Sequence, residues 1–437
     1  MKKFIYYSLF AVCLVSCTAD DPMQDETSGI PPISTSEIRT ANEAIEIASA
    51  VSSTFLPDRN ASLSRSGGRV VDPGTEVYTI HNHASRSGNT DPLLYIVNYA
   101  ENKGFAIVPT NRNAPDVIAV TENGHYNPTE GVEIGGFNEW LEDITEYLVK
   151  LESEEQPVAY ASGALRKVVT DTIFNRTVDP RIEVIWGQSN KTLDNPCESM
   201  FFDNENAGCA NVAIAMVMSY LEKPLSLRTT YLAPENNFDV RLRWDELKKY
   251  MSVHDNPPQV FPQAEYPGYS IRTSLGYLLR ELAQRNNSTF RDSLTTVAPN
   301  NFANTVRQFE LTSAPSWEFA DSTSCHDILF NYSGSVLFVG GYEDDYRNGH
   351  VWVCDGMKNF RLRDRIYEST DNGVTWNLID TSYSKYYRYV HYNWGWHGNC
   401  NGFYLDSATE AIPGGPDSGN TAIYNFTFLR TYIAVYR

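Results

Sequence analysis

Cys209 is the residue of this sequence best placed for nucleophilic chemistry. Apolar residues follow it at helical spacing, at Val212, Ala213, Met216 and Val217, which predicts a helix that begins at the cysteine. The first turn of a helix has unpaired N–H groups and the positive end of the helix dipole, and both stabilise a thiolate. A lone cysteine in an apolar run is more often a small buried hydrophobic residue. The interpretation therefore depends on partners elsewhere in the chain.

A cysteine nucleophile needs a base, a group that orients the base, and donors for the developing oxyanion. His350 is the candidate base, because it follows the small residue Gly349 and opens a strand-like run that extends to Cys354. The alternative is a histidine that is only hydrogen-bonded within a sheet. His391 and His397 are rival bases.

The orienting group and the oxyanion donor are predicted near two tryptophans and a glutamine. Asn393 could accept the imidazole N–H, and Trp394 and Trp396 could shield that bond from water. Two tryptophans around a glycine are also an ordinary aromatic corner in a sheet. Gln188 offers a side-chain amide for the oxyanion, beside the N–H of Cys209.

Three segments, in this order along the chain, carry a resemblance to a known enzyme family. They are Gly208-Cys209 with its Ala-rich helix, Gly349-His350-Val351-Trp352-Val353-Cys354-Asp355-Gly356, and Asn393-Trp394-Gly395-Trp396. Trp186-Gly187-Gln188 and Asn195-Pro196 fit the same pattern. The set resembles the streptopain-family cysteine peptidases over about residues 180–437, and residues 40–150 are similar to the pro-domain of that family.

The resemblance implies a papain-like fold, secretion as an inactive precursor, and endopeptidase activity. By position it makes Cys209 the nucleophile, His350 the general base and Gln188 the oxyanion donor. Asn393 and the tryptophans Trp394 and Trp396 would order the histidine. No metal or organic cofactor is expected, because a thiolate with a lowered pKa needs none.

The chain departs from the family pattern near the expected site. Asn211, Val212 and Met216 replace residues that are usual in the cysteine helix, and His397 stands where the family mostly has glycine. Two alternatives remain open. One is an acyl-transferase, transglutaminase-like, on the same scaffold. The other, which the altered helix keeps open, is a catalytically inactive papain-like surface protein that binds or inhibits a partner.

Length, charge and periodicity predict two folded units. A chain of 437 residues is too long for one ordinary core, and a net charge of −19 argues against a nucleic-acid or anionic-membrane surface. The predicted class is α+β. A catalytic domain over residues 182–437 has its cysteine helix against an antiparallel sheet, and a small α+β inhibitory pro-domain over residues 39–159 precedes it.

The predicted pro-domain has the order helix, meander, helix. A capping box at Thr40–Glu43 starts its first helix. Strand-like runs follow at residues 77–80, 93–100, 104–109 and 117–121, and an amphipathic helix covers residues 137–151. Residues 160–181 show a weaker pattern and are expected to be a connector that is exposed to maturation cleavage. A hairpin-like insert is predicted between residues 361 and 388.

The N-terminus predicts export. Met1-Lys2-Lys3 and the apolar run Phe4–Val15 fit a signal peptide, and Leu14-Val15-Ser16-Cys17 resembles the bacterial lipobox, in which Cys17 is acylated. An ordinary signal peptide with a chance cysteine is the alternative. Residues 1–17 are thus the lipoprotein signal peptide and residues 18–38 a flexible tether. We expect an outer-membrane lipoprotein, or a cell-surface or secreted protein, of a Gram-negative bacterium.

The expected partners follow from these interpretations. They are protein or peptide substrates, the chain's own pro-domain as an intramolecular inhibitor, and a membrane only through the N-terminal lipid. Beyond the targeting segment the cysteines are Cys197, Cys209, Cys325, Cys354 and Cys400. An odd number leaves at least one thiol free or intermolecular, and the pairing of the others stays open. No Cys or His pair has zinc spacing, so no metal site is predicted.

Overall fold

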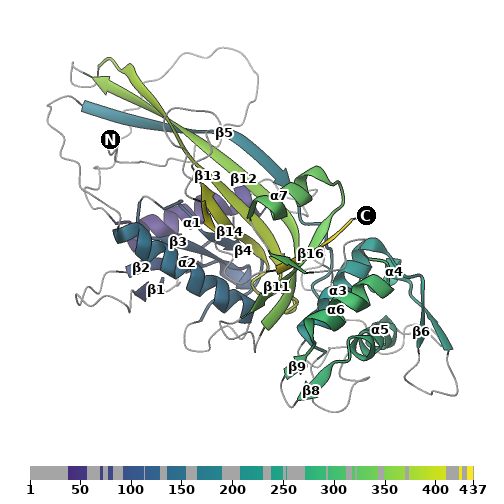
Figure 1. Cartoon of the computed structure of the whole chain (residues 1–437). Helices are drawn as coiled ribbons and strands as arrows, with labels where there is room; N and C mark the ends of the chain where they lie inside the picture. The colour runs from purple at the N-terminus through teal and green to yellow at the C-terminus, as the bar shows by residue number, and fades with distance from the viewer. Residues whose placement is uncertain are drawn as a thin grey trace, which may run out of the picture.

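The computed structural model describes residues 38–56, 69–71, 77–81, 92–112, 114–127, 135–153, 165–188, 207–229, 238–249, 252, 271–291, 294–311, 317–319, 322–342, 349–369, 374–409, 423–425 and 431–436 (Figure 1). The predicted signal peptide, its acylation site Cys17 and the tether up to residue 37 lie outside the described residues, as does Cys197. Among the helices of the described part, none combines the length and the apolar character needed to cross a membrane.

The N-terminal unit has the predicted order of helix, meander and helix. It comprises α1 (Ala41–Phe55), β1 (Tyr78–His81), β2 (Pro92–Asn98), β3 (Phe105–Pro109), β4 (Ala119–Thr121) and α2 (Gly135–Ser153), with a 3-10 turn at Ala100–Asn102. The capping box is confirmed, because the Thr40 hydroxyl accepts from the Glu43 N–H and the Glu43 carboxylate accepts from the Thr40 N–H.

In the C-terminal unit, helices precede an antiparallel sheet, which confirms the predicted α+β class. The helices are α3 (Cys209–Leu221), α4 (Trp244–Leu247), α5 (Ile271–Arg285), α6 (Pro299–Gln308) and α7 (Ser322–Asn331). Two short ladders pair β6 (Ser226–Thr229) with β7 (Phe238–Arg241) and β8 (Thr289–Arg291) with β9 (Leu294–Thr296). The sheet contains β10 (Glu318–Phe319), β11 (Val336–Tyr342), β12 (Gly349–Ser369), β13 (Asn377–Asn393), β14 (Gly402–Thr409), β15 (Ile423–Asn425) and β16 (Thr431–Val435).

The two units share one sheet, in which β4 of the N-terminal unit pairs with β14 of the C-terminal unit. The strand order is β1-β2-β3-β4-β14-β13-β12-β11-β16-β10, and β15 adds to β14. The junction is antiparallel, with Gly402 opposite Thr121 and Tyr404 opposite Ala119. Main-chain hydrogen bonds continue past the ladder, from Leu405 N to Ile118 O at 2.8 Å and from Glu122 N to the oxygen of Asn401 at 2.6 Å.

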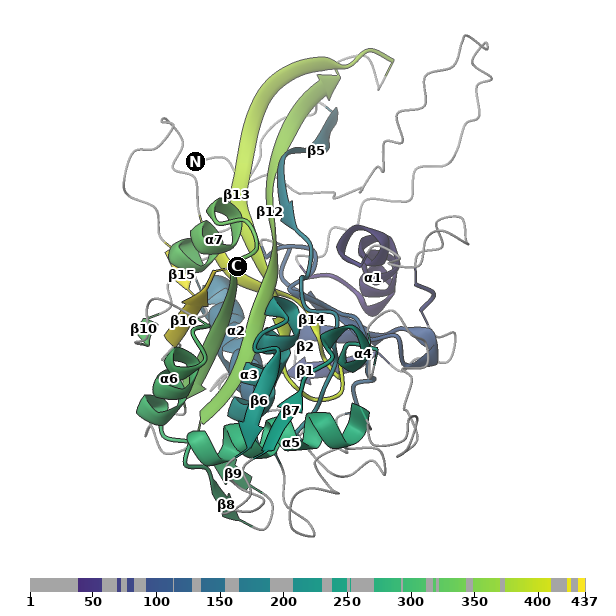
Figure 2. The same ribbon diagram turned by 90° about the vertical axis from the view of Figure 1, so that its right-hand side faces the viewer.

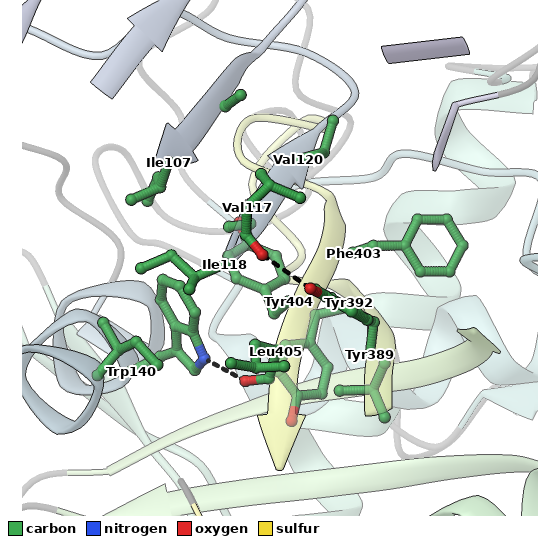
Figure 3. Close-up of a cluster of buried hydrophobic side chains, with 14 of the residues drawn as sticks. Ile107, Val117, Ile118, Val120, Trp140, Tyr389, Tyr392, Phe403, Tyr404 and Leu405 are labelled. Atoms are coloured by element: carbon green, nitrogen blue, oxygen red, sulfur yellow. Dashed lines mark hydrogen bonds between the residues drawn. The ribbon is translucent and has the colours of Figure 1, made fainter. Parts of the chain in front are cut away.

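Aromatic side chains bury this junction (Figure 3). Trp140 of α2 packs edge-on against Tyr404 of β14, with ring centroids 4.8 Å apart, and its indole N–H donates to Leu405 O at 3.2 Å. The Tyr389 hydroxyl of β13 donates to Val117 O at 2.7 Å. A single hydrophobic cluster therefore runs from the N-terminal helices into the C-terminal sheet.

A second hydrophobic cluster surrounds α3. Every residue from Ala210 to Ser219 is buried, which leaves Cys209 at the open end of an otherwise covered helix. The helix packs against α5 and against β12, where Val353 belongs to the same cluster. In Figure 1 the helices α3 to α6 lie on the opposite side of the sheet from α1 and α2.

Residues expected to connect the units instead form β5 (Leu165–Val178), which differs from the sequence-based expectation. β5 pairs antiparallel with β12, from Val178 opposite Met357 to Leu165 opposite Ser369. With β12 and β13, the predicted hairpin-like insert, it forms a long arm (Figures 1 and 2). The segment contains three valines and three threonines, which favour strands. Main-chain pairing with a neighbouring strand does not need the hydrophobic alternation that this segment lacks.

A substitution at Gly402 can test whether the β4–β14 pairing joins the two units. A Cβ at this position would lie 2.3 Å from Val120 O and 2.6 Å from Thr121 Cα, inside the backbone of β4. Gly402→Ala, in a full chain that also carries Cys209→Ala, is expected to weaken the pairing by about 1–3 kcal/mol. Amide hydrogen exchange at residues 118–122 should then rise by roughly 5- to 150-fold.

The control is Gly340→Ala on β11. A Cβ there would meet Thr431 and Trp317 at 3.3 Å and no atom of β4, so exchange at residues 118–122 should stay at the wild-type rate. If exchange at residues 118–122 is unchanged in Gly402→Ala, the β4–β14 pairing does not join the two units as expected.

Candidate active site

Cys209 is the first residue of α3, and the turn before it is tightly fixed. Gly208 has φ of 87°, in the left-handed region that favours glycine, and a Cβ there would lie 2.9 Å from the Thr295 side chain. Asn211, one of the departures from the family pattern, is buried and donates to Ala207 O at 2.7 Å. Cys209 is free and half-buried. The helix therefore begins with a partly exposed cysteine that follows a rigid turn.

His350 lies at the start of β12, and its ring stacks with two tryptophan rings that adjoin each other, with their centroids 4.9 Å apart. Trp352 stacks at a centroid distance of 5.9 Å and Trp394 at 6.5 Å. Its Nε2 is 3.2 Å from the main-chain oxygen of Trp394. Because a carbonyl oxygen can only accept, Nε2 must carry a proton, which leaves Nδ1 as the nitrogen that can exchange a proton with a thiol.

The structure brings Cys209 and His350 together. Burial raises the pKa of the Cys209 thiol, but the charge and the hydrogen bond of His350 lower it, as do main-chain hydrogen bonds from Val351 and Ala210. The net effect is a pKa below the ordinary thiol value. This combination of histidine and helix N-terminus is the environment in which a cysteine becomes nucleophilic.

The sequence predicted that Asn393 accepts the imidazole N–H, but the acceptor in the structure is the main-chain oxygen of Trp394. The Asn393 side chain donates to Val184 O at 3.0 Å and accepts from the Gly395 N–H at 3.2 Å. The Trp394–Gly395 peptide group thus points its carbonyl at His350 and its N–H at Asn393. Asn393 thus fixes this peptide group through the Gly395 N–H, while its amide nitrogen is held by Val184 O.

Gln188 is fixed by its main chain between the two halves of the site. Its N–H donates to Gly395 O at 3.2 Å, and its carbonyl accepts from Ala207 N, two residues before Cys209, at 3.0 Å. This placement suits the predicted oxyanion donor. His397 lies against Gly187, the residue before Gln188. A Cβ on Gly187 would come within 2.4 Å of the His397 imidazole ring. His397 also has φ of 55°, a conformation that glycine adopts readily.

The two predicted tryptophans differ in their surroundings. Trp394 is fully buried, and its indole N–H lies 3.0 Å from Cys400 O and 3.2 Å from the Tyr404 hydroxyl. Trp396 is half-buried and packs at the edge of the hydrophobic cluster. Only Trp394 contacts His350 among the interactions that the structure describes for these two rings.

Comparison with known proteins identifies the family. The model of the Peptidase C10 family matches residues 186–404, which is half of the chain. The chain belongs to the Peptidase C10 family. It is therefore a cysteine peptidase, which confirms the resemblance that its motifs indicated and does not favour the acyl-transferase or the non-enzymatic alternative. Residues 36–148 match the model of the Spi protease inhibitor, as expected for an inhibitory pro-domain.

Two solved structures from Prevotella intermedia are similar to this C10 peptidase. A prointerpain A fragment is 16% identical, covers 83% of this chain and 99% of its own, and has a TM-score of 0.47. Active wild-type interpain A cysteine protease is 16% identical, covers 60% of this chain and 96% of its own, and has a TM-score of 0.34. The comparison with curated proteins gives no match.

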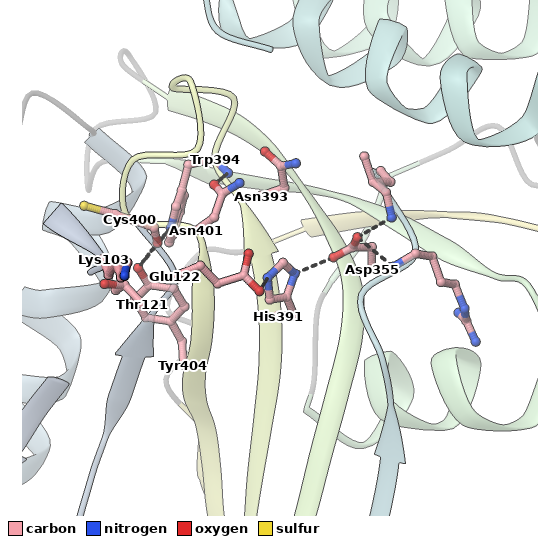
Figure 4. Close-up of polar contacts among 12 residues, drawn as sticks. Lys103, Thr121, Glu122, Asp355, His391, Asn393, Trp394, Cys400, Asn401 and Tyr404 are labelled. Atoms are coloured by element: carbon pink, nitrogen blue, oxygen red, sulfur yellow. Dashed lines mark hydrogen bonds and ion pairs between the residues drawn. The ribbon is translucent and has the colours of Figure 1, made fainter. Parts of the chain in front are cut away.

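His391, a rival base in the sequence, lies in a buried ion-pair network instead (Figure 4). Its Nδ1 is 2.6 Å from the Asp355 carboxylate, and its Nε2 is 3.6 Å from Glu122 of the pro-domain. Burial lowers the pKa of His391, but Asp355 and Glu122 raise it to about 9. Asp355 also accepts from the N–H groups of Arg181 at 3.0 Å and Ile182 at 2.7 Å. Asp355 belongs to the Gly349–Gly356 motif, but nothing in the sequence indicates that His391 is its partner.

Cys354 and Cys400 are less suited to nucleophilic attack than Cys209. Neither is in a disulfide bond and both are buried, and burial raises the pKa of the Cys400 thiol to about 12. In the part of the chain that the structure describes, no group of three or more His, Cys, Asp or Glu side chains could hold a metal ion.

His391 should titrate with a midpoint of about 9 in the precursor, above its ordinary value of 6.5. Because the folded-state pKa is raised, the ion pair stabilises the junction fully below about pH 6.5 and is lost as the pH rises through about 9. Glu122→Gln keeps the side-chain shape but removes one charge, so the midpoint should fall. Isotope-edited histidine NMR of the Cys209→Ala full chain measures it, with His391→Asn to assign the signal.

The matched control is Glu101→Gln, which removes an exposed pro-domain carboxylate that pairs with Lys103. It should leave the His391 midpoint unchanged. A wild-type midpoint near 6.5, or the same midpoint in Glu122→Gln and wild type, would contradict this network.

Proposed function

We propose that the chain is the zymogen of a cysteine endopeptidase whose catalytic pair is Cys209 and His350. The observation that carries the proposal is the thiol of Cys209, which lies at a helix N-terminus with its pKa lowered by His350. Protein or peptide substrates are expected. Endopeptidase rather than exopeptidase action follows from the family resemblance.

The geometry supports a two-step acyl transfer. His350 Nδ1 takes the proton of Cys209, and the thiolate attacks the carbonyl carbon of the scissile peptide. The Cys209 N–H and the Gln188 side chain stabilise the resulting oxyanion. His350 then returns the proton to the leaving amine, which departs as the tetrahedral species collapses to a thioester. In the second step His350 deprotonates a water molecule that attacks the thioester. The tetrahedral species then expels the Cys209 thiolate and releases the carboxylic acid, and the proton on His350 is again shared with Cys209, which restores the starting pair.

The Trp394 carbonyl orients His350, the proposed base, during this reaction. Its 3.2 Å hydrogen bond keeps the proton on Nε2 and stabilises the imidazolium that forms at each step. The stacked rings of Trp352 and Trp394 fix the ring plane. An uncharged acceptor suffices here because the partner thiolate supplies the opposite charge.

The pro-domain is the intramolecular inhibitor in this proposal. It is the part that matches the inhibitor model, and its β4 adds to the catalytic sheet at β14, next to the turn that holds His350. The pairing of β5 with β12 protects the bonds of residues 165–178, so maturation cleavage is expected before Leu165. The mature enzyme would then keep β5.

Export and lipid anchoring also remain proposals. The basic start, the apolar run and the lipobox-like segment ending at Cys17 support an exported lipoprotein in the cell envelope of a Gram-negative bacterium. The lipid would be the only membrane contact. The chain expressed from Met1 should therefore fractionate with membranes, and this fractionation should depend on Cys17.

The proposed function is tested with the chain from Thr18 onward as wild type and as Cys209→Ala. Wild type at neutral pH under reducing conditions should lose its N-terminal unit and then hydrolyse casein, and a thiol alkylator should block it. Cys209→Ala should stay intact and show at least about a thousandfold less hydrolysis. Intact mass and casein turnover are the measurements.

Two controls decide the interpretation. Cys400→Ala removes a buried free thiol and should retain hydrolysis that the alkylator still blocks. If wild type does not process itself, an added protease removes the N-terminal unit before the assay. No Cys209-dependent hydrolysis in that trimmed protein would contradict the proposal.

A further inference from the structure

The turn after β13 holds the acceptor of the catalytic histidine, and a residue from the far side of that turn holds Trp394 in place. The Trp394 carbonyl accepts from His350 Nε2 at 3.2 Å. The main-chain N–H of Trp394 donates to the side-chain oxygen of Asn401 at 3.0 Å (Figure 4). Trp394 follows the last residue of β13, so its N–H is not part of a sheet ladder and needs a side-chain partner.

Asn401 is itself fixed. Its side chain is buried, with 1% of its surface exposed. Its N–H donates to Gly398 O at 3.1 Å, and its carbonyl accepts from the Glu122 N–H of the pro-domain at 2.6 Å. The side-chain oxygen therefore reaches Trp394 from a rigid position just before β14.

We propose that Asn401 is a positioning residue for the catalytic histidine: its side-chain oxygen fixes Trp394 so that the Trp394 carbonyl faces His350 Nε2. This inference rests on the proposed role of His350 as general base. Asn401 touches neither the substrate nor the reacting atoms, and it acts only through Trp394.

The Asn401 side-chain oxygen matters because few other contacts fix the main chain of Trp394. Asn393 holds the peptide group that follows Trp394, and Asn401 holds the one that precedes it. Indole packing fixes the Trp394 side chain but leaves its main chain without a ladder. Removing the Asn401 oxygen leaves a buried N–H without a partner, which is unfavourable. The turn then rotates to find an acceptor or water, and the carbonyl that faces His350 moves with it.

The test compares Asn401→Ala with Asn401→Asp in the full chain, after processing or trimming. Asn401→Ala should lower kcat by about 10- to 100-fold with KM nearly unchanged, because misplacement of the base slows the chemical steps. A less stabilised imidazolium loses its proton at lower pH, and the thiol then ionises at higher pH. The bell-shaped pH profile of kcat/KM should therefore narrow from both sides. Asn401→Asp keeps an acceptor oxygen and should restore the rate and profile to within about threefold of wild type.

Asn399→Ala, an exposed change in the same turn, is the control and should match wild type. A lower rate in Asn401→Ala with an unchanged pH profile would show a merely structural role and overturn the inference. If Asn401→Ala does not fold, Asn401→Asp decides alone, and a tenfold or larger loss in it contradicts the inference. A wild-type enzyme without Cys209-dependent hydrolysis contradicts the proposed function instead, so the two failures are distinguishable.

Discussion

The main-chain pairing of β4 with β14 is the interaction on which the arrangement of the precursor depends. An edge strand exposes unpaired N–H and C=O groups, and at β14 the pro-domain supplies their partners from Ala119 to Thr121. This ladder makes two α+β units into one sheet. It also sets the register that brings Trp140 onto Tyr404 and Glu122 toward His391.

The turn between β13 and β14 receives contacts from both units. On its catalytic side, Trp394 O holds His350 and Gly395 O holds the Gln188 N–H. On the other side, Cys400 N donates to Asn123 O at 3.2 Å, and Asn401 O accepts from the pro-domain. The segment that contacts His350 and Gln188 is thus the segment that the pro-domain binds. In the precursor the pro-domain contacts the turn that holds His350, and Cys209 as a residue keeps part of its surface exposed.

Two buried charged side chains at the junction, Lys358 and His391, have partners in both units. Lys358 of β12 donates to Thr54 O, near the C-terminus of α1, at 2.6 Å, and it lies over the rings of Phe55 and Phe403. Burial lowers the pKa of Lys358 to about 8, although Asp179 and Glu122 raise it. His391 lies between a carboxylate of each unit. Removing one partner of such a pair leaves an uncompensated buried charge, so these groups favour the docked pro-domain.

The sequence predicted the parts of this structure that have local signatures. The cysteine helix follows from apolar spacing, α1 from its capping box, and the Cys209–His350 pair from motif order. The acceptor of the imidazole could not be predicted, because a main-chain carbonyl such as that of Trp394 has no residue type of its own. The Glu122–His391–Asp355 network escaped for another reason: its members meet only after the two units dock. β5 was missed because residues 165–178 lack the alternation of apolar and polar residues that marks a strand.

In the proposed mechanism, Cys209 and His350 form a thiolate–imidazolium ion pair before the substrate is attacked. The most direct measurement is the pH dependence of alkylation of Cys209 in the full chain, read by mass spectrometry of the peptide that contains it. Wild type should show an inflection below the ordinary thiol value of about 8.5, and His350→Ala should move the inflection upward by at least about one pH unit. An inflection at or above about 8.5 in both proteins would contradict the account.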